Sequence, residues 1–197
     1  MSIEAIVFLV LIGALLIWAI VTYNGFVSSR NRYQNAFSQI DVQLKRRYDL
    51  IPNLVNATQA SLRHERETLE AVVAARRHAM SAEQSARRNP GDGEALASLA
   101  AAEATLGSSL GRLMALVESY PELKGDQAVA RLTEELTSTE NRITFARQAF
   151  NDQVTGYNTE IESLPAAFVA GAAGFKRASQ LVATTRSEER EPVTVAL

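Results

Sequence analysis

The stretch that decides the fold runs from residue 126 to residue 163 and reads DQAVARLTEELTSTENRITFARQAFNDQVTGYNTEIES. Positions spaced alternately three and four residues apart in this stretch are mostly apolar. They are Val129, Leu132, Leu136, Thr139, Ile143, Ala146 and Phe150. This period places one apolar stripe along a helix, as in coiled-coil packing. The stripe needs other helices to cover it, so the rest of the chain must supply them.

The same period recurs in two earlier segments. The first stripe is Phe26, Arg30, Tyr33, Phe37, Ile40 and Leu44, and the second is Leu96, Leu99, Glu103, Leu106, Leu110, Leu113 and Val117. The prolines, at positions 52, 90, 121, 165 and 192, fall where helices would begin or end. We therefore predict helices over about residues 28–48, 50–88, 94–119 and 126–163, with Asp49 as N-cap of the second. Short connections predict an all-α fold, an antiparallel up-down bundle of four long helices.

Composition supports helices over sheets. The 197 residues include 31 Ala but only 10 Gly and 5 Pro, and aromatic residues make up 7%. Cysteine is absent, which excludes disulfides, thiolate metal sites and cysteine nucleophiles. A net charge of −2 argues against a general nucleic-acid binder, so we expect no nucleic-acid partner.

The N-terminal region is strongly apolar. Residues 6–21 read IVFLVLIGALLIWAIV, and with their flanks they approach the roughly 20 residues that cross a bilayer as a helix. The alternative is a cleaved signal peptide, which needs a basic start and a small-residue cleavage site. The first four residues contain no Lys or Arg, and no Ala-x-Ala sequence follows the apolar run. We therefore expect a retained transmembrane helix that continues into the first helix of the bundle.

Residues near the end of this apolar run indicate its orientation. Trp18 and Tyr23 suit the membrane interface, and Arg30 and Arg32 follow closely. Because positive charge stays on the cytoplasmic side, we expect a single-pass protein of the bacterial inner membrane with an extracytoplasmic N-terminus and a cytoplasmic bundle. The predicted division is an anchor and interface over 1–27, a helical bundle over 28–163, and an apolar and basic extension with a disordered C-terminus over 164–197.

Charge is divided unevenly along the bundle. Residues 28–88 carry 11 basic and 6 acidic side chains, whereas residues 89–163 carry 5 and 12. The simplest explanation is pairing between the two halves, and the alternative is contact of the basic half with anionic lipid. The candidate lipid or partner contacts are Arg76, Arg77, Arg87, Arg88, Phe168, Phe175, Lys176 and Arg177. A loosely packed extension is an equal alternative for the last four.

Three glutamates form the only candidate metal site. Glu65, Glu103 and Glu140 each lie about 15 residues from the end of the predicted bundle that is distant from the membrane, so their carboxylates would share one level. Pairing with arginine, or a position at the edge of a stripe, is the simpler interpretation. His64 begins a His-Glu-x-x sequence that ends in Thr68, which lacks the second zinc ligand. We therefore expect no cofactor and no catalytic activity.

Several segments together resemble the LemA family of bacterial single-pass membrane proteins. The most specific are QIDVQLKRRYDLIPNLV at residues 39–55 and TENRI at residues 139–143. The individual positions that carry the resemblance are Tyr23, Asn24, Arg47, Asp49, Pro52, Glu65, Arg76, Tyr120, Pro121, Glu140, Asn141, Arg142, Arg147, Tyr157 and Asn158. Phe150 and Leu164 depart from the family pattern by apolar exchanges. The resemblance covers about residues 1–177 and implies a short extracytoplasmic N-terminus, one anchor and a helical bundle, without implying a reaction.

These observations lead to one main functional hypothesis and two alternatives. The main hypothesis is a membrane-anchored, non-catalytic scaffold that self-associates or presents its bundle to membrane-associated protein partners. Gly107 and Gly111 would permit close helix approach within the bundle or between subunits. The alternatives are a carboxylate metal-binding bundle or enzyme that uses Glu65, Glu103 and Glu140, and an organiser of anionic lipid surfaces.

Overall fold

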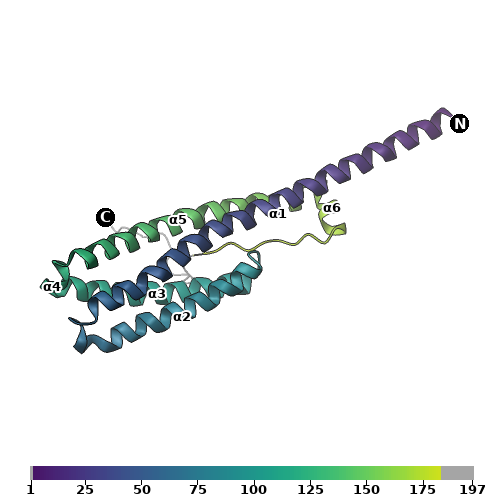
Figure 1. The fold of residues 1–197 in the computed structure, drawn as a ribbon. Coiled ribbons are helices and arrows are strands. Elements are labelled where there is room, and N and C mark those ends of the chain that lie inside the picture. Colours follow the sequence, from purple (N-terminus) through teal and green to yellow (C-terminus); the bar gives the residue numbers. More distant parts are fainter. Residues whose placement is uncertain (1, 183–197) are drawn as a thin grey trace, which may run out of the picture.

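The structure, a computed structural model, describes residues 2–182, and helices dominate this range (Figure 1). In chain order the elements are α1 (Ile3–Thr58), the 3-10 helix η1 (Arg63–Glu65), α2 (Arg66–Arg88), α3 (Gly93–Ser119), α4 (Pro121–Lys124), α5 (Gln127–Glu162) and α6 (Ala166–Ala172). The described residues contain no strand. The predicted all-α class and the long apolar first helix are confirmed.

Helix α1 is the axis of the molecule. Its 56 residues extend about 84 Å, far beyond the other helices, and its N-terminal part projects alone (Figure 1). In the described chain, α1 is the one helix long and apolar enough to cross a membrane, and none of its most apolar window is buried. Burial begins at Phe26, where the other helices start to cover it.

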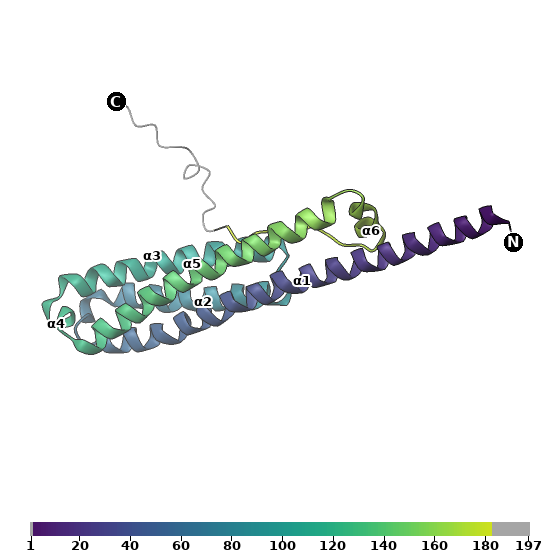
Figure 2. The ribbon, with the colours of Figure 1, turned by 90° about the horizontal axis from the view of Figure 1, so that it is seen from above.

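The remaining length of α1 packs with α2, α3 and α5 into what we call the helical body. Close contacts are concentrated in two antiparallel pairs, α1 with α5 and α2 with α3, and α1 also contacts α2 (Figure 2). The largest fully buried side chains are Phe37, Ile40, Leu44, Ile51, Leu54, Leu62, Val72, Leu96, Leu99, Leu106, Leu113 and Phe150. These are the apolar stripes, covered by one another. A regular four-helix bundle stays a prediction.

The first reversal of the chain lies later than predicted. We expected the first helix to end near Tyr48 and the second to begin at about residue 50, but α1 continues through Pro52 to Thr58, and α2 begins at Arg66. Asp49 is therefore inside α1, and its predicted role as an N-cap is wrong. Pro52 has no N–H to bond the Tyr48 carbonyl, and Arg76 of α2 donates from Nε to that oxygen at 2.6 Å. The helix passes the proline because another helix supplies the missing donor.

Two aspartates begin the later helices. Asp92 is the N-cap of α3 and accepts from the Ala95 N–H at 2.8 Å. Asp126 is the N-cap of α5 and accepts from the N–H groups of Ala128 and Val129. These carboxylates satisfy amides that have no partner within the first turn.

After α5 the chain turns back. Helix α6 lies beside the part of α1 that projects beyond the helical body, and residues 174–182, here called the C-terminal strap, then return along α5 (Figures 1 and 2). The predicted disorder of the C-terminus concerns residues that lie outside the described range.

Candidate functional site

The interior of the helical body contains a buried arginine. Arg47 of α1 is 4% exposed. Its guanidinium pairs with Glu103 of α3 and Glu140 of α5, and the hydroxyl of Tyr48 donates to Glu103. Burial raises the pKa of Tyr48 well above its ordinary value, which keeps this hydroxyl protonated as a donor. The four side chains, here called the Arg47 cluster, connect three helices through two ion pairs and one hydrogen bond.

A cavity of about 320 Å³ adjoins the Arg47 cluster. Its lining combines apolar side chains of three helices with the charged cluster and the end of the strap: Ile40, Leu44, Arg47, Leu99, Ala100, Glu103, Ala104, Gly107, Glu140, Ile143, Arg147, Leu181 and Val182. Two arginines and two glutamates balance in formal charge. The polar wall of the cavity is therefore neutral in formal charge.

The predicted layer of three glutamates does not form. Glu65 ends the 3-10 helix between α1 and α2, whereas Glu103 and Glu140 meet at Arg47. Among residues 2–182, no group of three or more His, Asp or Glu side chains is placed to hold a metal ion. The prediction failed because it measured helix positions from a reversal near residue 50, and the observed reversal is at residues 59–65.

A second polar cluster lies between α1 and α2. Glu83 faces Asp41, and Arg87 approaches Asp41 at 3.7 Å. Burial, followed by the hydrogen bond and the charge of Asp41, raises the pKa of Glu83 to about 7, against an opposing effect of Arg87. The facing carboxyl groups thus retain a proton at a pH where an exposed glutamate has lost it.

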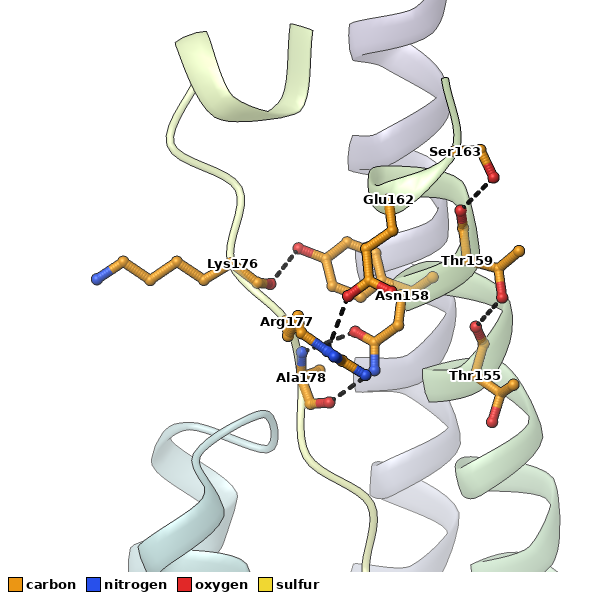
Figure 3. Close-up of polar contacts among 9 residues, drawn as sticks. Thr155, Asn158, Thr159, Glu162, Ser163, Lys176, Arg177 and Ala178 are labelled. Atoms are coloured by element: carbon orange, nitrogen blue, oxygen red, sulfur yellow. Dashed lines mark hydrogen bonds and ion pairs between the residues drawn. The ribbon is translucent and has the colours of Figure 1, made fainter. Parts of the chain in front are cut away.

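The C-terminal strap is held by two asparagines of α5. Asn158 donates from Nδ2 to the Ala178 carbonyl and accepts from the Ala178 N–H, both at 2.9 Å (Figure 3). Asn151 makes the same pair of bonds with Leu181, at 3.2 and 2.9 Å. Seven residues of helix rise about 10.5 Å, and three residues of extended chain span about 10 Å, so the two spacings match. This amide pairing is a feature that the sequence reasoning missed.

Further bonds tie the strap to its neighbours. The Tyr157 hydroxyl donates to the Lys176 carbonyl at 2.8 Å, and Arg177 pairs with Glu162 at 2.8 Å (Figure 3). The Ser179 N–H donates to the carbonyl of Gly91 in the turn between α2 and α3. A Cβ at Gly91 would meet the Tyr33 hydroxyl at 3.0 Å and the Ala178 Cβ at 3.3 Å, so this turn fits closely between α1 and the strap. The strap therefore joins both helix pairs.

Aromatic side chains surround the point where α1 leaves the helical body. Phe175 contacts Tyr23 and Phe26 edge to face, with centroids 5.5 and 5.3 Å apart, and the Arg30 guanidinium lies 5.5 Å from its ring. Arg32 pairs with Glu160 at 3.3 Å. Phe175, one of the candidate lipid or partner contacts, is half-buried and packs against α1.

The other predicted contact residues divide into two groups. Arg76 is bound to the α1 backbone, as described above, so it is committed within the helical body. The other six candidates are exposed: Arg77, Arg87, Arg88, Phe168, Lys176 and Arg177. Of these, Arg87 and Arg177 form the ion pairs described above. The close approach predicted within the bundle at Gly107 and Gly111 is not seen, because no heavy atom of another described helix lies within 4 Å of a Cβ built at either position.

Comparison with known proteins adds the family. The chain matches the LemA family over residues 36–197. It is 31% identical over 173 residues to magnetosome protein MamQ of Magnetospirillum gryphiswaldense, and this alignment covers 80% of the chain and 64% of the relative. It is 32% identical over 174 residues to magnetosome protein MamQ 2 of Paramagnetospirillum magneticum, covering 81% and 64%. The chain thus spans about 64% of the length of these curated relatives.

The family match and the structure agree on the kind of protein this is. The matched region contains the Arg47 cluster, the part of α1 around Pro52 and both asparagines that hold the strap. The exposed apolar start of α1 precedes it. The chain is a membrane-associated helical protein, and it belongs to the LemA family.

Proposed function

We propose that the chain acts as a non-catalytic scaffold that holds a rigid helical body at a membrane surface and presents it to other copies of itself or to membrane-associated proteins. The observation that carries this proposal is the continuity of α1, a single helix from the apolar segment to the far end of the helical body. A body that shares a helix with its anchor keeps a fixed distance and direction from the bilayer.

The polar interior supports a structural role. The carboxylates of Glu103 and Glu140 are engaged by Arg47 and Tyr48, so the charged groups of the cavity stabilise the contact between helices. Ion pairs and hydrogen bonds between these helices stabilise the relative positions of α1, α3 and α5.

Self-association is part of the proposal. Phe145 on the outer face of α5 is 71% exposed, and it borders a groove with Arg32, Asn35 and Gln39 of α1. Photo-crosslinking from position 145 in intact membranes tests this idea. Adducts at twice the mass of the chain are expected. If neither position 145 nor other exposed positions of α5 give such adducts, self-association through this face is contradicted.

The orientation is proposed from charge. Arg30 and Arg32 follow the apolar segment, which favours a cytoplasmic helical body in the bacterial inner membrane. Because the chain has no cysteine, the variants Ser2→Cys and Phe145→Cys each carry one reactive thiol. A membrane-impermeant maleimide should label Ser2→Cys in intact cells and Phe145→Cys only after permeabilisation. The reverse pattern would place the helical body outside the cytoplasm.

A further inference from the structure

An uncharged segment follows α5. Residues 163–175 read SLPAAFVAGAAGF and lie between Glu162 and the pair Lys176 and Arg177. An apolar stretch of this length is too short to span a bilayer and is typical of a buried core segment or of one that enters and leaves the same leaflet. Ala170 is buried, but the large side chains of Leu164 and Phe168 are 77% and 75% exposed, so the segment presents an uncovered apolar face.

The position of α6 places the segment beside the most apolar part of the molecule. A groove of about 570 Å³ separates α6 from α1. Its lining contains no charged side chain: Leu15, Leu16, Trp18, Ala19, Ile20, Tyr23, Phe168, Val169, Ala172 and Ala173. From Leu15 to Tyr23 α1 rises about 12 Å, so the groove is at the depth of the last two turns of the apolar segment. Figure 2 shows α6 there, beyond the end of α5 and next to α1.

The backbone of the segment suits an environment without water. Helix α6 ends at Ala172, and Gly174 two residues later has φ +74°. The N–H groups of Phe175 and Gly174 donate to the carbonyls of Ala170 and Gly171. These two bonds form a Schellman motif, which satisfies carbonyls that would otherwise need water. At the other end Pro165 has no N–H to satisfy.

Aromatic contacts hold the returning chain at the level where α1 becomes polar. Phe175 packs against Tyr23 and Phe26, and Arg30 lies over its ring. Lys176, the first charged residue after the segment, is exposed (Figure 3). An apolar segment flanked by aromatic and basic side chains matches the order of environments from hydrocarbon to headgroups.

We propose that residues 164–175 form a re-entrant hairpin in the same leaflet that α1 crosses, with lipid acyl chains in the groove and against Leu164 and Phe168. This inference rests on the membrane attachment of α1 in the proposed function. It gives the helical body a second insertion point next to the first. A second insertion point opposes tilting of the helical body relative to the bilayer.

Tryptophan fluorescence in vesicles tests the hairpin, because Trp18 is the sole tryptophan of the chain. Trp18→Phe combined with Phe168→Trp places the probe on α6. The matched control combines Trp18→Phe with Phe145→Trp, at a position of similar exposure on the helical body. Full-length proteins are reconstituted in phosphatidylcholine vesicles with plain or brominated acyl chains, and far-UV circular dichroism verifies their helix content.

Brominated lipid should lower the emission of the probe at position 168 about twofold, as for a ring among acyl chains, and leave the probe at position 145 unchanged. Quenching of Trp18 in the unaltered protein without quenching at position 168 would overturn the hairpin and leave the anchor intact. Absence of quenching at both positions would overturn the anchor itself. If Phe168→Trp disturbs folding, Leu164→Trp in the same Trp18→Phe background serves as the probe. Quenching at position 164 is then expected, and its absence while Trp18 is quenched in the unaltered protein would overturn the hairpin.

Discussion

Arg47 shows how one buried charge is accommodated. Isolated in the interior, a guanidinium would be destabilising by several kcal/mol, but here it reaches carboxylates on two different helices. The neighbouring side chain of Tyr48 donates to Glu103 as well. This buried position is thus occupied by a charged side chain whose partners are fixed only after three helices assemble.

Replacement of Arg47 should destabilise the protein strongly. Arg47→Met leaves Glu103 without its cation, and we expect a loss of about 3 kcal/mol in the free energy of unfolding. Arg46→Met is the matched control, since Arg46 and its partner Glu135 are each 50% exposed, and it should cost less than about 1 kcal/mol. Chemical denaturation of the full-length protein in detergent micelles measures both. Similar losses for the two variants would contradict a structural role of the buried pair.

The facing carboxyl groups of Glu83 and Asp41 predict a pH dependence. The pKa of Glu83 is about 7 in the folded protein and lower in the unfolded chain, so folding favours the protonated form. The stabilisation is complete at acidic pH and is lost as the pH rises through about 7, with a magnitude of about 1 kcal/mol after allowance for solvent screening.

The variant Glu83→Gln removes this titration. Its Tm should exceed that of the unaltered protein at pH 8 and approach it at pH 5, as followed by circular dichroism. Glu67→Gln, at an exposed position of the same helix, serves as control and should follow the unaltered protein at both pH values. A constant difference between Glu83→Gln and the unaltered protein across this range would contradict the raised pKa.

At the scale of elements, Pro52 and Arg76 explain the length of α1. A proline inside a helix leaves the carbonyl four residues earlier without a donor, and such a site commonly kinks or ends the helix. Here the Tyr48 carbonyl accepts a hydrogen bond from Arg76 Nε instead. Helix rules that consider only local sequence therefore predict an end of the first helix before Pro52. Packing against α2 allows the helix to continue beyond the proline.

A double-mutant cycle checks this explanation. Arg76→Met should destabilise the unaltered protein by about 2 kcal/mol, because a partly buried carbonyl loses its donor. In the Pro52→Ala background the same change should cost less than half as much, because the backbone at position 52 then has an N–H that donates to the Tyr48 carbonyl. Arg77→Met, at the exposed neighbouring position, controls for loss of charge. An equal cost of Arg76→Met in both backgrounds would disprove the compensation.

The C-terminal strap is an element without regular secondary structure of its own. Its peptide groups bond to the side-chain amides of Asn151 and Asn158 in place of a neighbouring strand. The seven-residue spacing of the two asparagines on α5 is visible in the sequence. Asparagines with this spacing also occur on helix surfaces that face solvent, so the spacing alone does not predict the strap. Its meaning depends on a chain segment that passes beside it.

At the scale of the whole molecule, α1 joins the exposed apolar segment to the helical body in one continuous helix. Leu9 and Val42 are 58% and 55% exposed, and both belong to this one helix. Spin labels at Leu9→Cys and Val42→Cys in nanodiscs should give a narrow distance distribution centred at about 50 Å by double electron–electron resonance. The additional change Ser28→Pro should broaden or shorten it. A broad distribution in the protein without that proline would show that anchor and body move independently.

The sequence by itself determined the helical class, the exposed apolar start and the family, because these depend on local periodicity, on a continuous apolar run and on motifs read in order along the chain. The tertiary structure decided where α1 ends, which carboxylates meet Arg47, and how the segment after α5 returns. Each of these depends on groups far apart in the chain: Arg76 supplies a donor to the helix that contains Pro52, and Glu103 and Glu140 approach from two other helices. Glu65 was misplaced for the same reason, since a reversal displaced by several residues moves every later position along the helix axis.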